Sequence, residues 1–231
     1  MEVAARYLPS GRSVLVGGDW YDSIPLHDSR TLLVMGDVMG HGFQAAVAMS
    51  QYRSLLRTIA ASASASASAS ASPSASPSVT GVDEILVEFD RQVAQLGLDR
   101  LATCLLVVMD PRAGTCTAAS AGHLPPAVLQ PDGSIKVLWL PAGPPIGTGL
   151  GGHAPLTVRL DRGSTLLLYT DGLVERRGTD IDVSVQALEA LSLPADDPLD
   201  DMLDTCLARL ANGAYEDDVA ILAARRRDET E

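Results

Sequence analysis

Six aspartates in four short motifs are the residues of this sequence best suited to chemistry. Each motif stands beside a predicted strand end, where a buried carboxylate must be paired, hydrogen-bonded or bound to a metal. Taken singly, an aspartate in such a place is also ordinary turn chemistry, in which the side chain caps its own loop. The motifs are GGDWYD with Asp19 and Asp22, GDVMGHG with Asp37, YTDGLVE with Asp171, and YEDDVAIL with Asp217 and Asp218.

Taken together, the four motifs favour a metal site. Several carboxylates at one end of a sheet repel one another unless a cation lies among them, and none of the motifs contains a lysine. Mg²⁺ and Mn²⁺ prefer oxygen ligands, and the neighbouring glycines would let backbone carbonyls approach a metal closely. Two such ions about 3.5–4 Å apart are a usual device for hydrolysing phosphate esters through a metal-activated water, which requires no Ser or Cys nucleophile.

The composition indicates a globular protein and limits its partners. Hydrophobic residues make up 46% and charged residues 20% of the 231 residues, as in ordinary soluble proteins. No apolar run approaches the roughly 20 residues that span a bilayer, and the N-terminus does not resemble a secretory signal, so we expect a cytoplasmic protein. The net charge of −12 repels nucleic acid and anionic membranes, and neither is an expected partner.

The elements that must position the aspartates follow from hydrophobic period and turn residues. Residues 13–16 and 31–35 are predicted as short strands that lead into the first two motifs. Apolar residues at helical spacing predict helices over 42–59, 82–96 and 199–210. Residues 61–78 alternate Ala and Ser and include two prolines, which predicts a flexible Ala/Ser/Pro-rich loop.

Beyond residue 100, short apolar runs separated by Gly, Pro and Asp predict strands. The sequence PDGS predicts a hairpin between 127–130 and 135–138, and a last strand is expected over 219–223. Cys104, Cys116 and Cys206 have neither zinc-ligand nor redox spacing, so we expect them to be structural. Hairpin-linked strands with segregated helices predict an α+β domain of antiparallel sheets faced by helices, with residues 1–231 as a single domain.

Six motifs in order closely resemble the bacterial PP2C-like (PPM-type) serine/threonine phosphatases of the SpoIIE/RsbU group. The resemblance extends from about Val3 to Arg225, and it implies a sandwich of two antiparallel β-sheets flanked by helical layers. It also implies metal-dependent removal of phosphate from phosphoserine or phosphothreonine in a protein. The motifs are GGDWYD, GDVMGHG, ATCLLVVMDPRAGTCTAASAGHLPPAVL, GPPIG, LLLYTDGLVERRG and EDDVAIL.

The resemblance assigns roles to the acidic motifs, with Asp19, Asp37 and Asp171 as the catalytic carboxylates and two Mn²⁺ or Mg²⁺ ions as cofactors. Asp19 would bind one metal, Asp37 would bridge both, and the Val38 carbonyl would complete the shell of the second. Asp171 and Asp217 would hold the other metal. Asp22 and Asp218 remain candidates either for holding metal-bound waters or for a structural role.

The sequence departs from the wider PP2C pattern at the histidine. In eukaryotic relatives, a DGHGG motif places a histidine two residues after the bridging aspartate, where it can act as a general acid. Here that position is Met39, and His41 follows two residues later, so a role in the loop or at the helix start is expected for His41. His123 in AGHLPP matches a family motif and is expected to pack at the rim of the active site. In the wider family an arginine near the N-terminus binds the phosphate, and no arginine of this sequence matches it.

The resemblance also suggests the partners. The usual substrate of this group is a phosphorylated anti-sigma-factor antagonist, and relatives commonly carry upstream sensor domains such as PAS or GAF modules. Two other functions stay open. One is a pseudophosphatase that binds a partner without turnover, although all four acidic motifs are intact. The other is a hydrolase of nucleotides or other small phosphate esters, for which an aromatic content of 4% offers few stacking platforms.

Overall fold

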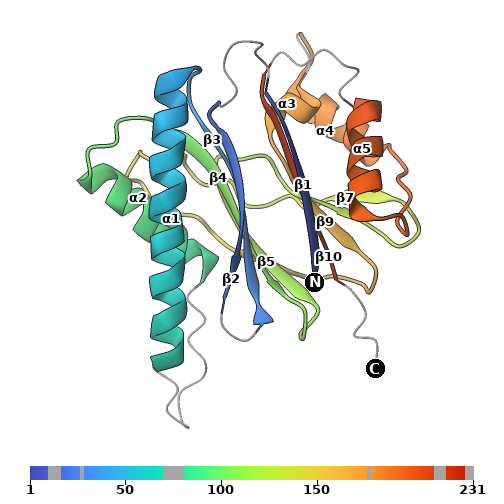
Figure 1. The fold of residues 1–231 in the computed structure, drawn as a ribbon, viewed down its shortest axis with the longest axis horizontal. Coiled ribbons are helices and arrows are strands. Elements are labelled where there is room, and N and C mark those ends of the chain that lie inside the picture. The colour runs from blue at the N-terminus through green and yellow to red at the C-terminus, as the bar shows by residue number, and fades with distance from the viewer. Residues whose placement is uncertain (10–16, 27–28, 70–80, 176–177, 211–216, 227–231) are drawn as a thin grey trace.

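The computed structural model describes residues 1–9, 17–26, 29–69, 81–175, 178–210 and 217–226, and these form two antiparallel sheets (Figure 1). The first sheet has the strand order β1 (Glu2–Leu8), β10 (Val219–Arg225), β9 (Thr165–Tyr169), β6 (Ala127–Leu129) and β7 (Ile135–Val137). The second has the order β2 (Asp19–Pro25), β3 (Thr31–Val38), β4 (Ala102–Asp110), β5 (Thr115–Ala121) and β8 (Leu156–Arg159).

Helices cover the outer face of each sheet, so that the layers run helix, sheet, sheet, helix (Figure 1). α1 (Phe43–Ala69) and α2 (Val82–Gln95) pack on the second sheet, and α3 (Asp171–Val174), α4 (Ile181–Glu189) and α5 (Leu199–Leu210) pack on the first. The predicted α+β sandwich of two antiparallel sheets between helical layers is confirmed.

The core has three parts because both faces of each sheet are buried. Along β3, Leu33 and Met35 point between the sheets, whereas Leu32 and Val34 point towards α1 and α2. This alternation follows from the two-residue period of a strand, and it explains why the run is apolar at every position. Tyr52 of α1 meets Phe89 of α2 edge to face, with the ring centroids 5.8 Å apart.

The helix α1 extends further than the sequence predicted. It ends at Ala69, so residues 61–69 are helical and the predicted loop is wrong there; residues 70–78 lie outside the described residues. Alanine has the highest helix propensity of all residues, and alternating serines reduce it only modestly. A helix that packing has already nucleated upstream can therefore continue through the Ala/Ser repeat.

The other predicted elements agree with the structure except near the N-terminus. The hairpin at PDGS is confirmed, with Ala127 paired to Val137 and Leu129 to Ile135. The predicted strand over 13–16 lies outside the described residues. GGDWYD is not a turn, since its last four residues open β2. The strand β1 and the helices α3 and α4 were not predicted.

No described helix is long and apolar enough to cross a lipid bilayer.

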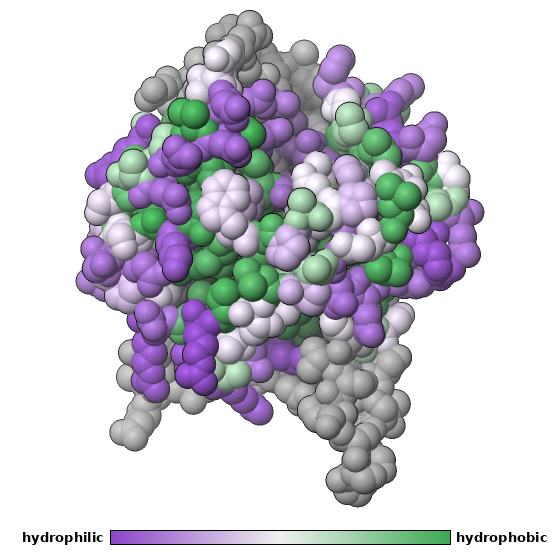
Figure 2. Space-filling model, turned by 180° about the vertical axis from the view of Figure 1, so that it is seen from behind, coloured by the Kyte–Doolittle hydropathy of each residue, from purple (hydrophilic) through white to green (hydrophobic). Residues whose placement is uncertain are grey.

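The face opposite that of Figure 1 shows patches of apolar surface among polar residues (Figure 2).

Candidate metal centre

Two of the predicted aspartates lie directly opposite each other on neighbouring strands. Asp19 of β2 pairs with Asp37 of β3, and Asp37 pairs in turn with Thr103 of β4. Directly opposite residues share a face of the sheet, with their Cβ atoms about 5 Å apart. Asp19 is 5% exposed, and its Oδ2 atom has no hydrogen-bond partner among the described residues. A buried carboxylate oxygen without a hydrogen-bond partner is suited to binding a cation.

The other two predicted ligands come from the first sheet. Asp171 is the first residue of α3 and is separated from β9 by Thr170, and Asp217 stands two residues before β10. Because β9 and β10 are antiparallel neighbours, the end of one lies beside the start of the other. Between them, the Thr170 backbone N–H donates to the Ala220 carbonyl over 3.0 Å, and the Thr170 side chain lies close enough to Asp19 to favour the charged form of its carboxyl group.

The electrostatics of the site are those of crowded carboxylates. Burial, followed by the charge of Asp37, raises the pKa of Asp19. Burial and the charge of Asp171 raise the pKa of Asp37, with smaller effects from Asp217 and Asp218. Burial and the charge of Asp217 raise the pKa of Asp171. Each carboxylate is thus destabilised by the others, and a cation among them would relieve the repulsion.

The Val38 carbonyl lies against the backbone of the neighbouring strand, in contact with Gly18. A Cβ atom at Gly18 would approach the Val38 oxygen to 2.5 Å and Asp37 Oδ1 to 3.0 Å, so only glycine fits there. The next residue, Met39, is also fixed, because the Arg100 side chain donates a hydrogen bond to its carbonyl over 3.0 Å. These contacts fix the peptide that follows Asp37.

The residues present fit a hard divalent cation by their chemistry, since the donors are carboxylate and carbonyl oxygens and one buried oxygen is unpartnered. Among the described residues, however, no group of three His, Cys, Asp or Glu side chains is arranged closely enough to hold a metal ion. The structure therefore brings Asp19 and Asp37 together, and it places Asp171 and Asp217 close enough to influence their titration.

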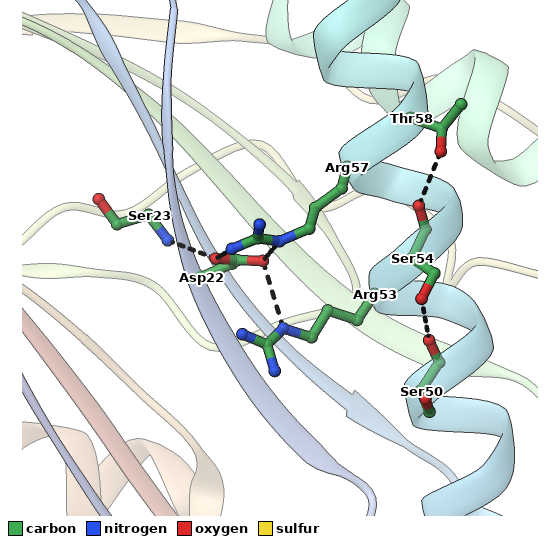
Figure 3. Close-up of polar contacts among 7 residues, drawn as sticks. All are labelled: Asp22, Ser23, Ser50, Arg53, Ser54, Arg57 and Thr58. Atoms are coloured by element: carbon green, nitrogen blue, oxygen red, sulfur yellow. Dashed lines mark hydrogen bonds and ion pairs between the residues drawn. The ribbon is translucent and has the colours of Figure 1, made fainter.

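Asp22 belongs to a different cluster, on the opposite face of β2. Residues three apart in a strand point to opposite faces, and Asp22 points towards α1, where Arg57 and Arg53 bind it (Figure 3). Arg57 Nη2 donates to Asp22 Oδ1 over 2.5 Å and Arg53 Nε donates to Oδ2 over 3.3 Å. Burial opposes the charged form, but the two arginines outweigh it, so the pKa of Asp22 is lowered. This side chain serves a structural role.

Asp218 joins the start of β10 to the segment before β2. It is buried, and the Tyr7 hydroxyl donates to its Oδ2 atom over 3.2 Å while accepting a bond from the Gly17 N–H over 2.9 Å. A Cβ atom at Gly17 would overlap this carboxylate, at 1.3 Å from Oδ2. Asp218, which follows Asp217, is therefore linked through Tyr7 to Gly17, which lies two residues before Asp19.

The histidines lie in different surroundings. His41 is exposed in the turn between β3 and α1. His123 is half-buried and contacts Thr103 and the Tyr169 backbone; burial lowers its pKa to about 4. It lines a pocket of about 410 Å³ together with Asp37 and Asp171, and this pocket continues over Thr103, Leu124, Glu175, Thr179 and Ile181.

Thr103 and Thr170 also lie at this site, and neither was predicted from the sequence. Thr170 adjoins Asp171 in the motif YTDG, so its position was available from the sequence but its contact with Asp19 was not. Thr103 is placed by the register of β4 against β3, for which the sequence carries no direct signal.

Two antiparallel sheets between helical layers, with buried aspartates where the sheets meet, define the PP2C class of phosphatase domains. The chain belongs to the SpoIIE family within this class, because the family model "Stage II sporulation protein E (SpoIIE)" matches residues 27–227. The resemblance noted from the motifs is thereby confirmed.

Solved structures support this assignment. The RsbU and RsbW domains of Rv1364c from Mycobacterium tuberculosis are 33% identical, with a TM-score of 0.82 over 100% of this chain and 61% of that one. Two further structures share the fold. They are the PP2C domain and a regulatory fragment of SpoIIE from Bacillus subtilis (19% identity, TM-score 0.74, 96% of this chain and 62% of that chain) and the SiaA PP2C domain of Pseudomonas aeruginosa (21%, 0.72, 96% and 84%).

A curated relative is much longer than this chain. Protein IcfG of Synechocystis sp. (strain ATCC 27184 / PCC 6803 / Kazusa) is 28% identical over 175 residues, which is 70% of this chain and 27% of IcfG. The chain therefore spans about a quarter of that relative.

Proposed function

We propose that this protein is a Mg²⁺- or Mn²⁺-dependent phosphatase that removes phosphate from phosphoserine or phosphothreonine in a protein. The observation that carries the proposal is the cross-strand pair of Asp19 and Asp37. Asp19 is buried with one carboxylate oxygen unpartnered among the described residues, and burial together with neighbouring carboxylates raises the pKa of both aspartates. Clusters of this kind cost stability unless a cation binds, so they are retained where the cation has a use.

In the proposed site, Asp19 would bind one metal ion, Asp37 would contact both ions, and the Val38 carbonyl would complete the ligand set of the second ion. Asp171 and Asp217 would hold the other metal ion. When bound, the ions supply a water of lowered pKa and positive charge for the phosphoryl oxygens. The Thr170 side chain favours the charged form of Asp19. The pocket that Asp37 and Asp171 share with Leu124 and Ile181 receives the phosphorylated side chain.

The proposed substrate is a phosphorylated anti-sigma-factor antagonist. Support comes from the relative in Mycobacterium tuberculosis, whose structure contains an RsbU and an RsbW domain. Upstream sensor domains are proposed as regulators, in keeping with the greater length of IcfG. The proposal also places the protein in the cytoplasm.

Hydrolysis of an aryl phosphate with and without Mn²⁺ tests the activity. Wild type should turn over only with the metal, and Asp37→Ala and Asp171→Ala should abolish turnover. Asp201→Ala, on the exposed side of α5, is the matched control and should retain it. Residual turnover of Asp37→Ala above about a tenth of wild type would contradict Asp37 as the bridging ligand, because loss of a bridging carboxylate removes both ions.

A second panel tests the substrate class. Phosphopeptides should be hydrolysed in preference to nucleotides, and the reverse order would favour a small phosphate ester as the substrate.

A non-catalytic binding module is the alternative, and one observation favours it. No three acidic or histidine side chains of the described residues converge on a metal position. Calorimetry separates the two functions: a folded protein that binds a phosphorylated partner but neither binds Mn²⁺ nor turns over would support the binding module, whereas Mn²⁺ binding without turnover would indicate an enzyme in an inactive state.

A further inference from the structure

The His123 ring lies between the two sheets at the candidate site. On one side, Nδ1 is 2.7 Å from the Thr103 hydroxyl of β4, in the second sheet. On the other side, Nε2 is 3.2 Å from the Tyr169 carbonyl at the end of β9, in the first sheet. The His123 backbone is itself fixed, since Ser120 Oγ accepts from its N–H over 3.0 Å and donates to its carbonyl over 2.9 Å.

The partners determine the tautomer. A backbone carbonyl can only accept a hydrogen bond, so Nε2 must carry the proton that binds Tyr169. In the neutral ring, Nδ1 is then an acceptor, and the Thr103 hydroxyl must donate to it. The two contacts together admit the Nε2–H form and disfavour the Nδ1–H form.

The two ends of this bridge attach to the candidate ligands. Thr103 lies opposite Asp37 in the β3–β4 register. Tyr169 stands two residues before Asp171, and the intervening Thr170 contacts Asp19. His123 therefore connects the strand beside Asp37 to the segment that ends at Asp171, across the space between the sheets.

We propose that His123 is a positioning residue whose Nε2–H tautomer joins the two sheets and sets the separation of Asp37 from Asp171. In its effect on metal binding, this inference rests on the proposed function. A histidine that only filled the core would not need two directional bonds to different sheets, nor would it line the same pocket as Asp37 and Asp171.

Nitrogen NMR of the protein labelled with ¹⁵N-histidine tests the tautomer without reference to activity. The ring-nitrogen signals that disappear in His123→Gln are those of His123. The expected result is a protonated Nε2 and an unprotonated Nδ1, and Thr103→Val should shift Nδ1 while leaving the proton on Nε2. An Nδ1–H form, or rapid exchange between both forms, would overturn the proposal.

Calorimetric Mn²⁺ titration tests the positioning. Loss of groups that orient metal ligands typically lowers metal affinity by about 10-fold or more, so His123→Ala should weaken Mn²⁺ binding by about 10-fold and Thr103→Val by less. His123→Gln should recover part of the loss, because its amide can donate to the Tyr169 carbonyl. Thr117→Val is the control; it removes a hydroxyl that binds Thr157 on the same sheet, and it should bind Mn²⁺ as wild type does.

The outcomes separate the two claims. Unchanged Mn²⁺ affinity in a folded His123→Ala or Thr103→Val protein would overturn the positioning role while leaving the phosphatase proposal intact. If His123→Ala does not fold, Thr103→Val alone decides the question, since valine keeps the shape of threonine. Absence of Mn²⁺ binding in wild type would refute the metal site and the positioning role together, while the NMR result would still decide the tautomer.

Discussion

At the scale of single residues, sequence position does not decide which aspartates act together. Asp19 and Asp22 stand in one motif, yet Asp19 joins the carboxylates between the sheets and Asp22 joins two arginines of α1. The alternation of a strand separates them. Asp19 and Asp37, which are eighteen positions apart, are instead direct neighbours.

The crowded carboxylates predict how the stability of the metal-free protein depends on pH. Folding raises the pKa of Asp19, Asp37 and Asp171, that of Asp37 to about 6. Above the ordinary carboxyl pKa of about 4, the folded protein therefore binds more protons than the unfolded chain. The free energy of unfolding should fall as pH rises from about 4 through these raised values.

Thermal unfolding midpoints in chelator, measured from about pH 5 to about pH 8, check this sign. Because other groups titrate as well, the informative quantity is the difference between wild type and Asp37→Asn. That variant lacks one of the repelling charges, so its midpoint should fall less over the same range. An equal or steeper fall in Asp37→Asn would show that Asp37 is not under repulsion.

At the scale of elements, α1 is attached to the edge strand β2 by the ion-pair cluster of Asp22, Arg53 and Arg57 (Figure 3). Asp22 is 5% exposed, whereas the arginine side chains are about half exposed. Loss of the carboxylate charge should therefore weaken the attachment without leaving a deeply buried cation.

Asp22→Asn should lower the free energy of unfolding by about 1.5–3 kcal/mol, the usual range for a hydrogen bond to a charged group. Urea denaturation measures the change, with an unaltered slope as evidence that the variant still unfolds in one step. Asp161→Asn, in an exposed turn, is the control and should change the value by less than about 0.5 kcal/mol. A loss of stability in the control as large as in Asp22→Asn would assign no special role to the cluster.

The elements also show how much of the fold could be predicted. The strands from β4 to β9 were accessible because they are apolar and end at Gly, Pro or Asp, and α2 and α5 were accessible from their helical period. β1 was missed because EVAARYL mixes small, charged and aromatic residues at a half-buried edge. β2 was missed because two of its residues are acidic and have their partners elsewhere in the chain.

At the site, the ligand types were predictable but their partners were not. Asp37, Asp171 and Asp217 stand out by residue type beside predicted strands. That Arg57 neutralises Asp22, and that His123 reaches both Thr103 and Tyr169, depends on how helices and sheets pack. Such contacts join positions 20 to 46 residues apart, and no local pattern encodes them.

At the scale of the whole molecule, the proposed ligands come from both sheets, so metal binding should stabilise the entire fold. A ligand that binds only the folded state at about 100 times its dissociation constant adds about 2.7 kcal/mol. For a chain of this size, that corresponds to a rise of the unfolding midpoint on the order of 5–10 °C.

Scanning calorimetry with Mn²⁺ and then with added chelator measures this rise and its reversal. The unfolding midpoint of Asp37→Ala should rise little when Mn²⁺ is added. A midpoint of wild type that does not respond to Mn²⁺, in a protein shown to be folded, would contradict a site that spans both sheets.

The pairing of β1 with β10 has a consequence for how the protein is made. Glu2 lies opposite Arg225, so the first sheet gains its last neighbouring pair only when nearly all of the described chain has left the ribosome. β2 to β5 follow one another along the chain, so the half of the site with Asp19 and Asp37 can assemble early in synthesis. The half with Asp171 and Asp217 can assemble only after β9 and β10 have been synthesised, and contacts between such distant segments form slowly. The nascent chain is therefore without a complete set of the proposed acidic ligands until Asp217 has been synthesised.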